Sequence, residues 1–208
     1  MKKVNAFAAV VILSVTTFAF TTRPVSDGTR ADSPMLKMVE QTMHEALEIT
    51  PTNDRNRDFV RYVQVLHKGG MQLAQFELAN GHHEEVKAVA KEAIDSTKSD
   101  MMMLDKYLAG LKPKAEDIKD KFANEAHDAL YDMVKESDNT KLNGDVDHDY
   151  TVLGQRITDA EQDVAQAYVR FGADPMLERI AKRMVDTKKE EMKDLKEGKQ
   201  EVKREDKK

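Results

Sequence analysis

The chain has 208 residues and a net charge of −5 from 33 Lys or Arg and 38 Asp or Glu, with 12 Met, no Trp and no Cys. Because charges of both signs are closely mixed along the chain, the composition argues against a nucleic-acid-binding surface. The lack of Cys excludes disulfides, thiolate metal sites and a lipid-modified N-terminal cysteine. Any metal ligand must therefore be His, Met or a carboxylate.

The N-terminal residues predict an export signal. Lys2 and Lys3 precede an apolar run over residues 6–20, and a polar stretch over residues 21–33 follows it. This run is shorter than the roughly 20 residues that span a bilayer, which favours a cleaved signal peptide over residues 1–22 rather than an anchor. We therefore expect an exported protein, periplasmic or extracellular, with no membrane span in its mature form.

Proline, glycine and apolar spacing predict an all-α chain. Ser33 and Pro34 are typical of an N-cap and a first helical turn, Gly81 is typical of a helix C-terminus, and Pro113 cannot continue a helix. The predicted helices cover residues 34–48, 55–80, 84–111, 114–135 and 147–171, and a sixth begins at Pro175. The last, highly charged residues are expected to continue the sixth helix in solvent or to fray.

The long helices carry apolar stripes at steps of three and four residues. The stripe of the second predicted helix comprises Phe59, Tyr62, Val63, Leu66, Gly70, Leu73 and Glu77, and that of the third comprises Val86, Val89, Ala93, Thr97, Met101, Leu104, Leu108 and Leu111. Two antiparallel hairpins can bury such stripes by packing into a four-helix bundle. The leader helices 34–48 and 114–135 are then expected to cover an end or a side.

The second half of the chain repeats the first without a gap at an offset of 91 residues. Asp54, Asp58, Gln64, Ala74, Gln75, Gly81, Ala90, Lys91, Asp95, Lys98, Met101 and Leu104 recur as Asp145, Asp149, Gln155, Ala165, Gln166, Gly172, Ala181, Lys182, Asp186, Lys189, Met192 and Leu195. An ungapped match predicts equal helix lengths and an equal turn. We expect one two-copy domain over residues 33–200, with copies over 35–111 and 114–198 and a charged tail over 199–208.

Several of these residues form a family pattern. In the first copy it comprises Asp58-Phe59-Val60-Arg61, His67, Gly69, Ala74, Glu77, Leu78, Gly81, Glu85, Ala88, Ala90 and Leu108, and in the second Gly144-Asp145, Asp149-Tyr150, Ala165, Gly172, Asp174-Pro175, Leu177, Ala181 and Glu191. With these residues the chain resembles, over about residues 35–195, the ferritin-like family catalogued as domain of unknown function 305. The resemblance implies a ferritin-like four-helix bundle.

The family's chemical signature is a His pair flanked by Met, which implies soft metal ions and, for some members, copper handling. In the first copy the pair positions hold Leu66 and His67, and the flanking positions hold Val63 and Leu73. In the second copy the pair positions hold Ile157 and Thr158, with Gly154 and Val164 on the flanks. A single His therefore remains of the pairs that the resemblance implies.

That remaining His could still belong to a soft-metal site. His67 and Met71 lie one helical turn apart on one face, and Met101 can approach from the next helix, so imidazole and thioether groups could converge on a copper ion. The alternative is that Met71 and Met101 fill gaps in the core, as Met usually does, and that His67 is solvated at the edge of the stripe.

Two other groups are weaker metal candidates. His82 and His83 are adjacent in the predicted turn after residue 80, where they can chelate a metal adventitiously or cap the next helix. Met101, Met102 and Met103 form either a soft-metal patch or a partner surface, or they are neutral surface residues. Met101 lies on the core stripe, and the other two point away from its centre.

Catalytic motifs are missing from the sequence. A carboxylate-bridged di-iron bundle needs Glu-x-x-His motifs, and none occurs here. No Gly-rich loop follows a strand, and no Ser lies in a nucleophile-elbow context. The repeated Asp95 and Asp186 are expected to form ion pairs within the bundle, with Lys91 and Lys182. We therefore predict that the protein is not an enzyme.

Two functional hypotheses follow. The first is a non-catalytic binding or structural protein of the cell envelope, with a largely eroded metal site and a protein partner or a second copy of itself on its exposed faces. The alternative is a soft-metal, copper-binding or copper-buffering protein that uses His67, Met71 and Met101, with His82 and His83 as weaker candidates.

Overall fold

The computed structural model describes residues 33–52, 54–112, 121–138, 140–172 and 174–186, which are helical apart from short connections and contain no strand. The helices are α1 (Pro34–Leu47), α2 (Arg55–Asn80), α3 (Glu84–Gly110), α4 (Lys121–Asp138) and α5 (Val146–Phe171), and a further helical segment covers residues 175–186. The all-α prediction is thus confirmed. The predicted signal peptide 1–22, the chain after residue 186 and its tail 199–208 lie outside the described residues.

The helix ends lie close to their predicted positions. Ser33 caps α1 by accepting a hydrogen bond from the Leu36 amide at 3.3 Å, with Pro34 in the first turn. The α4 helix differs, because it is described from Lys121, extends three residues past the predicted end at 135, and follows a segment, 113–120, outside the described residues.

Gly81 and Gly172 end α2 and α5, as predicted, but they do so in an extended conformation, with φ of −65° and −67°. The left-handed C-cap that glycine usually supplies is therefore not the reason for these residues. A Cβ atom at either position would overlap with the side chain and the carbonyl oxygen four residues earlier, on Glu77 or Tyr168. Glycine is required here because of this close approach.

The loops that precede α2 and α5 make the same hydrogen bonds, 91 residues apart. The Asp58 carboxylate accepts from the Thr52 amide at 2.9 and 3.0 Å, and the Asp149 carboxylate accepts from the Asn143 amide at 3.0 Å. The caps of α2 and α5 match in the same way: Asp54 accepts from the amides of Asn56 and Arg57, and Asp145 accepts from the amide of His148. The third pair of positions differs, because Asp174 caps the segment 175–186, whereas the equivalent His83 makes no side-chain cap on α3.

The buried core is supplied mainly by α1, α2, α4 and α5. The leader helices contribute Met35, Leu36, Val39, Met43 and Ala46 from α1, and Phe122, Ala126, Leu130 and Met133 from α4. Helix α3 buries Val86, Ala90, Ile94 and Leu104, and the segment 175–186 buries Leu177 and Ala181. The leader helices are thus part of the core and do not merely cover an end or a side of it.

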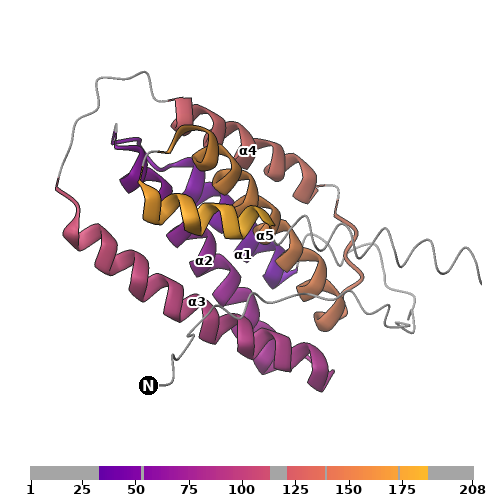
Figure 1. Ribbon diagram of the computed structural model, residues 1–208. Coiled ribbons are helices and arrows are strands. Elements are labelled where there is room, and N and C mark those ends of the chain that lie inside the picture. The colour runs from indigo at the N-terminus through magenta and orange to yellow at the C-terminus, as the bar shows by residue number, and fades with distance from the viewer. Residues whose placement is uncertain (1–32, 53, 113–120, 139, 173, 187–208) are drawn as a thin grey trace, which may run out of the picture.

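Figure 1 shows the resulting arrangement, in which α3 runs along one side of the molecule and α4 along the opposite side. Helices α2 and α5 pack together between them, and α2 also packs against α1 and α3. The stripe on α3 includes Ala93 and Thr97, which are only half-buried, whereas α1 and α4 present large side chains inward. Because the side chains that α1 and α4 bury are large and apolar, these two helices contribute much of the core.

An aromatic cluster fills the core where α2 begins and α5 ends. The Phe59 and Tyr168 rings stack with centroids 4.2 Å apart, and Phe122 of α4 meets the Tyr168 ring edge-on at 5.8 Å. Offset and edge-on aromatic pairs of this kind stabilise a core by roughly 0.5–1.5 kcal/mol beyond the burial of their area. This cluster therefore fixes the relative position of α2, α4 and α5.

Candidate functional site

His67, the residue singled out by the sequence, forms an ion pair between α2 and α5. Its Nδ1 atom lies 2.7 Å from Oε1 of Glu161, and the two side chains are only 12 % and 17 % exposed. An imidazole on one helix and a carboxylate on the next thus meet near the middle of the bundle. The prediction that His67 is solvated at the edge of the stripe is wrong, because Glu161 is its partner and little of its ring reaches water.

The surroundings of His67 favour its protonated form. Burial alone would lower the pKa of His67, but the charge and hydrogen bond of Glu161, together with the charge of Asp100 on α3, outweigh burial and raise it above the ordinary value. The pKa of Asp100 is raised by burial, against the opposing charges of His67 and Arg183. The charged groups around His67 and Asp100 therefore come from four elements, which are α2, α3, α5 and the segment 175–186.

The predicted methionine ligands lie in different surroundings. Met71 is partly buried and packs against the hydrophobic core, and Met101 is half-buried on α3. Among the described residues no three His, Asp or Glu side chains are arranged to hold a metal ion. His67 is thus held by charged neighbours, and Met71 packs as a core methionine usually does.

His82 and His83 lie in the turn between α2 and α3, as predicted, with exposed side chains. Their backbone amides donate to the carboxylate of Asp147 on α5, at 3.0 Å from His82 and 2.8 Å from His83. The His83 side chain makes no capping hydrogen bond to α3. In the structure this His pair therefore contributes backbone donors that hold the turn against α5.

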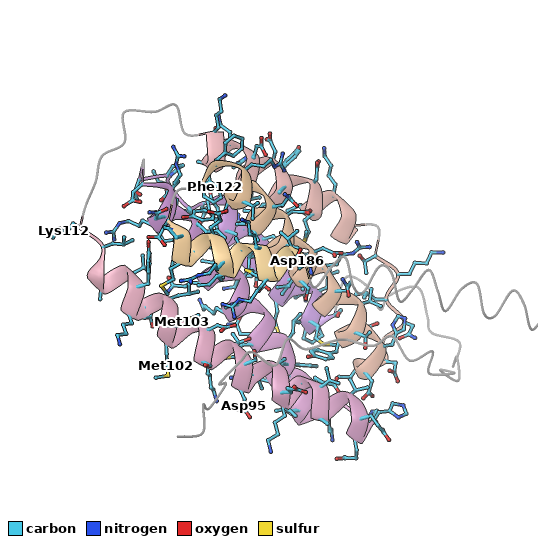
Figure 2. The ribbon with its side chains drawn as sticks, viewed as in Figure 1. Asp95, Met102, Met103, Lys112, Phe122 and Asp186 are labelled. Atoms are coloured by element: carbon cyan, nitrogen blue, oxygen red, sulfur yellow. The ribbon has the colours of Figure 1, made fainter. Side chains whose placement is uncertain are left out.

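The methionine run and the repeated aspartates lie at or near the surface. Met102 is 74 % exposed and points away from the bundle in Figure 2, while Met103 is half-buried. Asp95 and Asp186 are also exposed, and Lys182 pairs with Glu178, 2.5 Å away. The predicted location of the two aspartates inside the bundle is wrong, because both are exposed, and their pairing with Lys91 and Lys182 stays a prediction.

The structure adds a buried pair of acids that the sequence interpretation missed. Glu77, near the C-terminal end of α2, and Asp147, in the first turn of α5, are both completely buried. Asp147 accepts the two backbone hydrogen bonds from the turn, whereas neither carboxyl oxygen of Glu77 has a well-aligned hydrogen-bond partner. A buried carboxyl group without such partners strongly disfavours its charged form.

The two acids accordingly titrate in opposite directions. Burial and the neighbouring Asp147 carboxylate raise the pKa of Glu77 from 4.5 to about 8. Burial alone would raise the pKa of Asp147, but the hydrogen bonds from His83 and His82 outweigh it and hold that pKa below its ordinary value. Glu77 is therefore the protonated partner at neutral pH, and Asp147 carries the negative charge.

The same positions at the opposite end of α2 and α5 hold neutral groups. Adding 91 to Glu77 gives Tyr168, and subtracting 91 from Asp147 gives Asn56. The Tyr168 hydroxyl donates to the Asn56 side-chain oxygen at 2.5 Å and accepts from the Asp174 amide at 3.4 Å. These equivalent positions thus supply an acidic contact at one end of α2 and α5 and a neutral contact at the other.

One sequence signal pointed to the acidic pair. Glu77 occupies a position on the apolar stripe of α2, where a charged residue is unexpected. Its partner Asp147 is 70 positions further along the chain, so the pairing could not be found from local spacing. Only the packing of α2 on α5 brings the two carboxyl groups together.

Comparison of the chain with protein-family models, with curated proteins and with solved structures found no match. None of the described helices combines the length and the apolar character that a membrane crossing requires.

Proposed function

We propose that this chain is a non-catalytic binding or structural protein of the cell envelope, exported by its N-terminal signal. In this proposal the scaffold is a ferritin-like bundle made of two copies of one helical unit, related to the family catalogued as domain of unknown function 305. Its ancestral metal site has largely been lost. Function then resides on its exposed faces, through a protein partner or a second copy of the chain.

The recurrent hydrogen bonds support the two-copy origin. The Asp58 and Asp149 carboxylates receive amides from residues that are themselves 91 positions apart, and Gly81 and Gly172 end their helices with nearly the same backbone angles. Such loop and cap geometry depends on particular side chains, so its recurrence at one offset is more specific than a shared helix length. A duplicated unit accounts for it directly.

The His67–Glu161 ion pair is the observation that carries the proposal. It joins α2 to α5 at 2.7 Å in a place with little access to water. Metal binding requires a neutral imidazole, whereas this surrounding stabilises imidazolium. The last His of the implied ligand pairs thus serves as a link between the two copies.

A soft-metal function is the second candidate, and one observation favours it. Carboxylates often orient a metal-binding imidazole from the ring nitrogen that does not face the metal. Glu161 contacts Nδ1 of His67, and Met71 follows one helical turn later. Copper would have to use Nε2 of His67 together with the thioethers of Met71 and Met101, and would have to displace the proton that the site favours.

Titration of the mature protein with Cu(I) and with Cu(II) separates the two candidates. Wild type is compared with His67→Gln and with the matched control His127→Gln, which alters an exposed His on α4. The main proposal predicts no stoichiometric binding tighter than micromolar in any of the three proteins. Tight binding that survives in His127→Gln and disappears in His67→Gln would establish the soft-metal function instead.

The structural role of the pair has its own test. A double-mutant cycle with His67→Gln and Glu161→Gln, measured by urea unfolding at pH 6, should give a coupling free energy of about 1 kcal/mol or more for this little-exposed pair. A coupling indistinguishable from zero would remove the ion pair as a link between the copies.

Export is tested separately, by sequencing the N-terminus of the protein recovered from its native cells after fractionation. A mature chain that begins after residue 22 in the envelope or the medium is expected. A cytosolic chain that keeps residues 1–22 would contradict this part of the proposal.

A further inference from the structure

Three parts of the molecule meet where the buried carboxyl groups of Glu77 and Asp147 interact. Glu77 belongs to α2, Asp147 belongs to α5, and the amides of His82 and His83 join the turn before α3 to the same carboxylate. Gly81 lies so close to the Glu77 carboxyl that no side chain fits between them. The site is therefore too closely packed to admit a bulky counter-ion, and both acids are fully buried.

Helix geometry assigns opposite charge states to the two acids. Asp147 lies in the first turn of α5, where the helix dipole and free amides stabilise a negative charge. Glu77 lies near the C-terminal end of α2, where the dipole opposes one. Two buried carboxyl groups in contact cannot both ionise without a large penalty, so one proton between them satisfies the site.

We propose that Glu77 and Asp147 share one proton as a lock, and that release of this proton to water at alkaline pH detaches the α2–α3 turn from α5. Glu77 carries the proton while the lock is closed. Once it ionises, two negative charges face each other in a buried contact, and opening the turn lets water reach both of them.

Charged groups from several elements affect the protonation of Glu77 and Asp147. They comprise Asp145 and Asp147 from α5 and its cap, Lys87 from α3 and His83 from the turn, and the uncharged Tyr150 of α5 lies beside them. Asp145 and Asp147 favour the protonated form of Glu77, and Lys87 opposes them. The net result is a pKa for Glu77 of about 8, above its ordinary value of 4.5.

Because the pKa of Glu77 is higher in the folded protein than in the unfolded chain, the free energy of unfolding should fall as pH rises. A buried acid whose pKa is raised in the folded state stabilises the fold fully below its unfolded pKa, and this contribution is lost as pH rises to the folded value. The window for Glu77 therefore runs from about pH 4.5 to about pH 8. Within it, each pH unit should reduce the ratio of folded to unfolded protein by up to about tenfold.

The decisive experiment is urea unfolding of the full chain between pH 5 and 9.5, with Glu77→Gln and Tyr168→Phe beside wild type. A Gln side chain keeps a donor for Asp147 but has no proton to lose, so its stability should exceed that of wild type progressively towards pH 8. Tyr168→Phe alters the equivalent position at the other end and should keep the wild-type pH profile. Parallel profiles for wild type and Glu77→Gln would overturn the lock.

Two measurements on wild type keep the proposal testable if Glu77→Gln does not fold. The carboxyl carbon resonance of Glu77 should titrate near pH 8, and the amide of His83 should lose its protection from hydrogen exchange over the same pH interval. A resonance that titrates near its ordinary value, or an amide whose protection is unchanged up to pH 9, would refute the proton lock.

Discussion

Helices α2 and α5 are joined at each end by side chains at equivalent positions, but the two contacts differ in their chemistry. At one end Tyr168 reaches across to Asn56 at 2.5 Å, within an aromatic cluster that includes Phe59. At the other end the equivalent positions hold Glu77 and Asp147, and the buried ring of Tyr150 lies near Glu77. Backbone angles and glycine caps match, yet one end is neutral and the other depends on a proton.

The two contacts should therefore differ in how their strength depends on pH. The neutral contact joins a phenol hydroxyl to an amide oxygen and involves no carboxyl group. The acidic contact is strong only while Glu77 is protonated. Helix ends with similar backbone angles are therefore held by a neutral contact at one end and by a contact that depends on a proton at the other.

The largest expected effect comes from the glycine caps. Gly172→Ala places a Cβ against the Tyr168 ring, which is stacked on Phe59 and cannot move, and should cost about 3 kcal/mol or more of unfolding free energy. Gly81→Ala places it against the carboxyl end of Glu77, a more flexible side chain, and should cost about 1–2 kcal/mol less than that. Urea unfolding at pH 6 measures both, and an equal loss would show that the two ends are equally rigid.

Next in size is the loss of the neutral contact. Tyr168→Phe leaves the Asn56 side chain without its donor and should cost about 1–2 kcal/mol at every pH from 5 to 9. The check is the same unfolding series, with Tyr131→Phe, an exposed tyrosine on α4, as the control that should change little. A cost that varied strongly with pH would break the distinction between the two ends.

The N-caps should give nearly equal losses. Asp54→Ala and Asp145→Ala each remove the acceptor for amides in the first helical turn, of α2 and α5 respectively, and each should cost about 1 kcal/mol. Only Asp145→Ala should also lower the pKa of Glu77, because Asp145 is one of the charges that raise it. Thermal unfolding measures the loss of stability in both variants, and the pH titration of the Glu77 carboxyl carbon resonance measures the change in pKa that is expected in Asp145→Ala alone.

The last prediction concerns how the stability of the whole molecule depends on pH. His67 and Glu77 both have raised pKa values, so their stabilisation is lost as pH rises, whereas Asp147 and Asp174 have lowered values and lose theirs as pH falls below about 3.8. The stability that these four groups contribute should therefore be greatest between about pH 3.8 and 4.5, above the ordinary pKa of the two aspartates and below that of Glu77. Midpoints of thermal unfolding from pH 3 to 9 test this, and a maximum above pH 8 would contradict it.

Most of the helical architecture could be predicted because its signals are local. Pro34, Gly81 and Pro113 mark helix ends, and steric and hydrogen-bonding limits of the backbone act within a few residues of them. The offset of 91 residues also implied equal caps in the two halves, and the matching hydrogen bonds of Asp58 and Asp149 agree with that expectation.

The candidate sites were harder to predict because their partners come from distant helices. His67 was found from its place in a family pattern, but Glu161, which holds it, is 94 positions away. Glu77 stood out on an apolar stripe, but nothing in its neighbourhood in the chain indicates Asp147. The share of α1 and α4 in the core was also underestimated, because apolar spacing does not reveal which stripes face one another.

The sequence alone determined the helices, their caps and the recurrence at a fixed offset, since propensity, capping and periodicity are properties of short segments. The tertiary structure alone decided that a lone imidazole forms one half of an ion pair and that two acids face each other in a fully buried place. Charge states depend on burial and on the nearest opposite or like charge, and both are set only when α2 packs on α5.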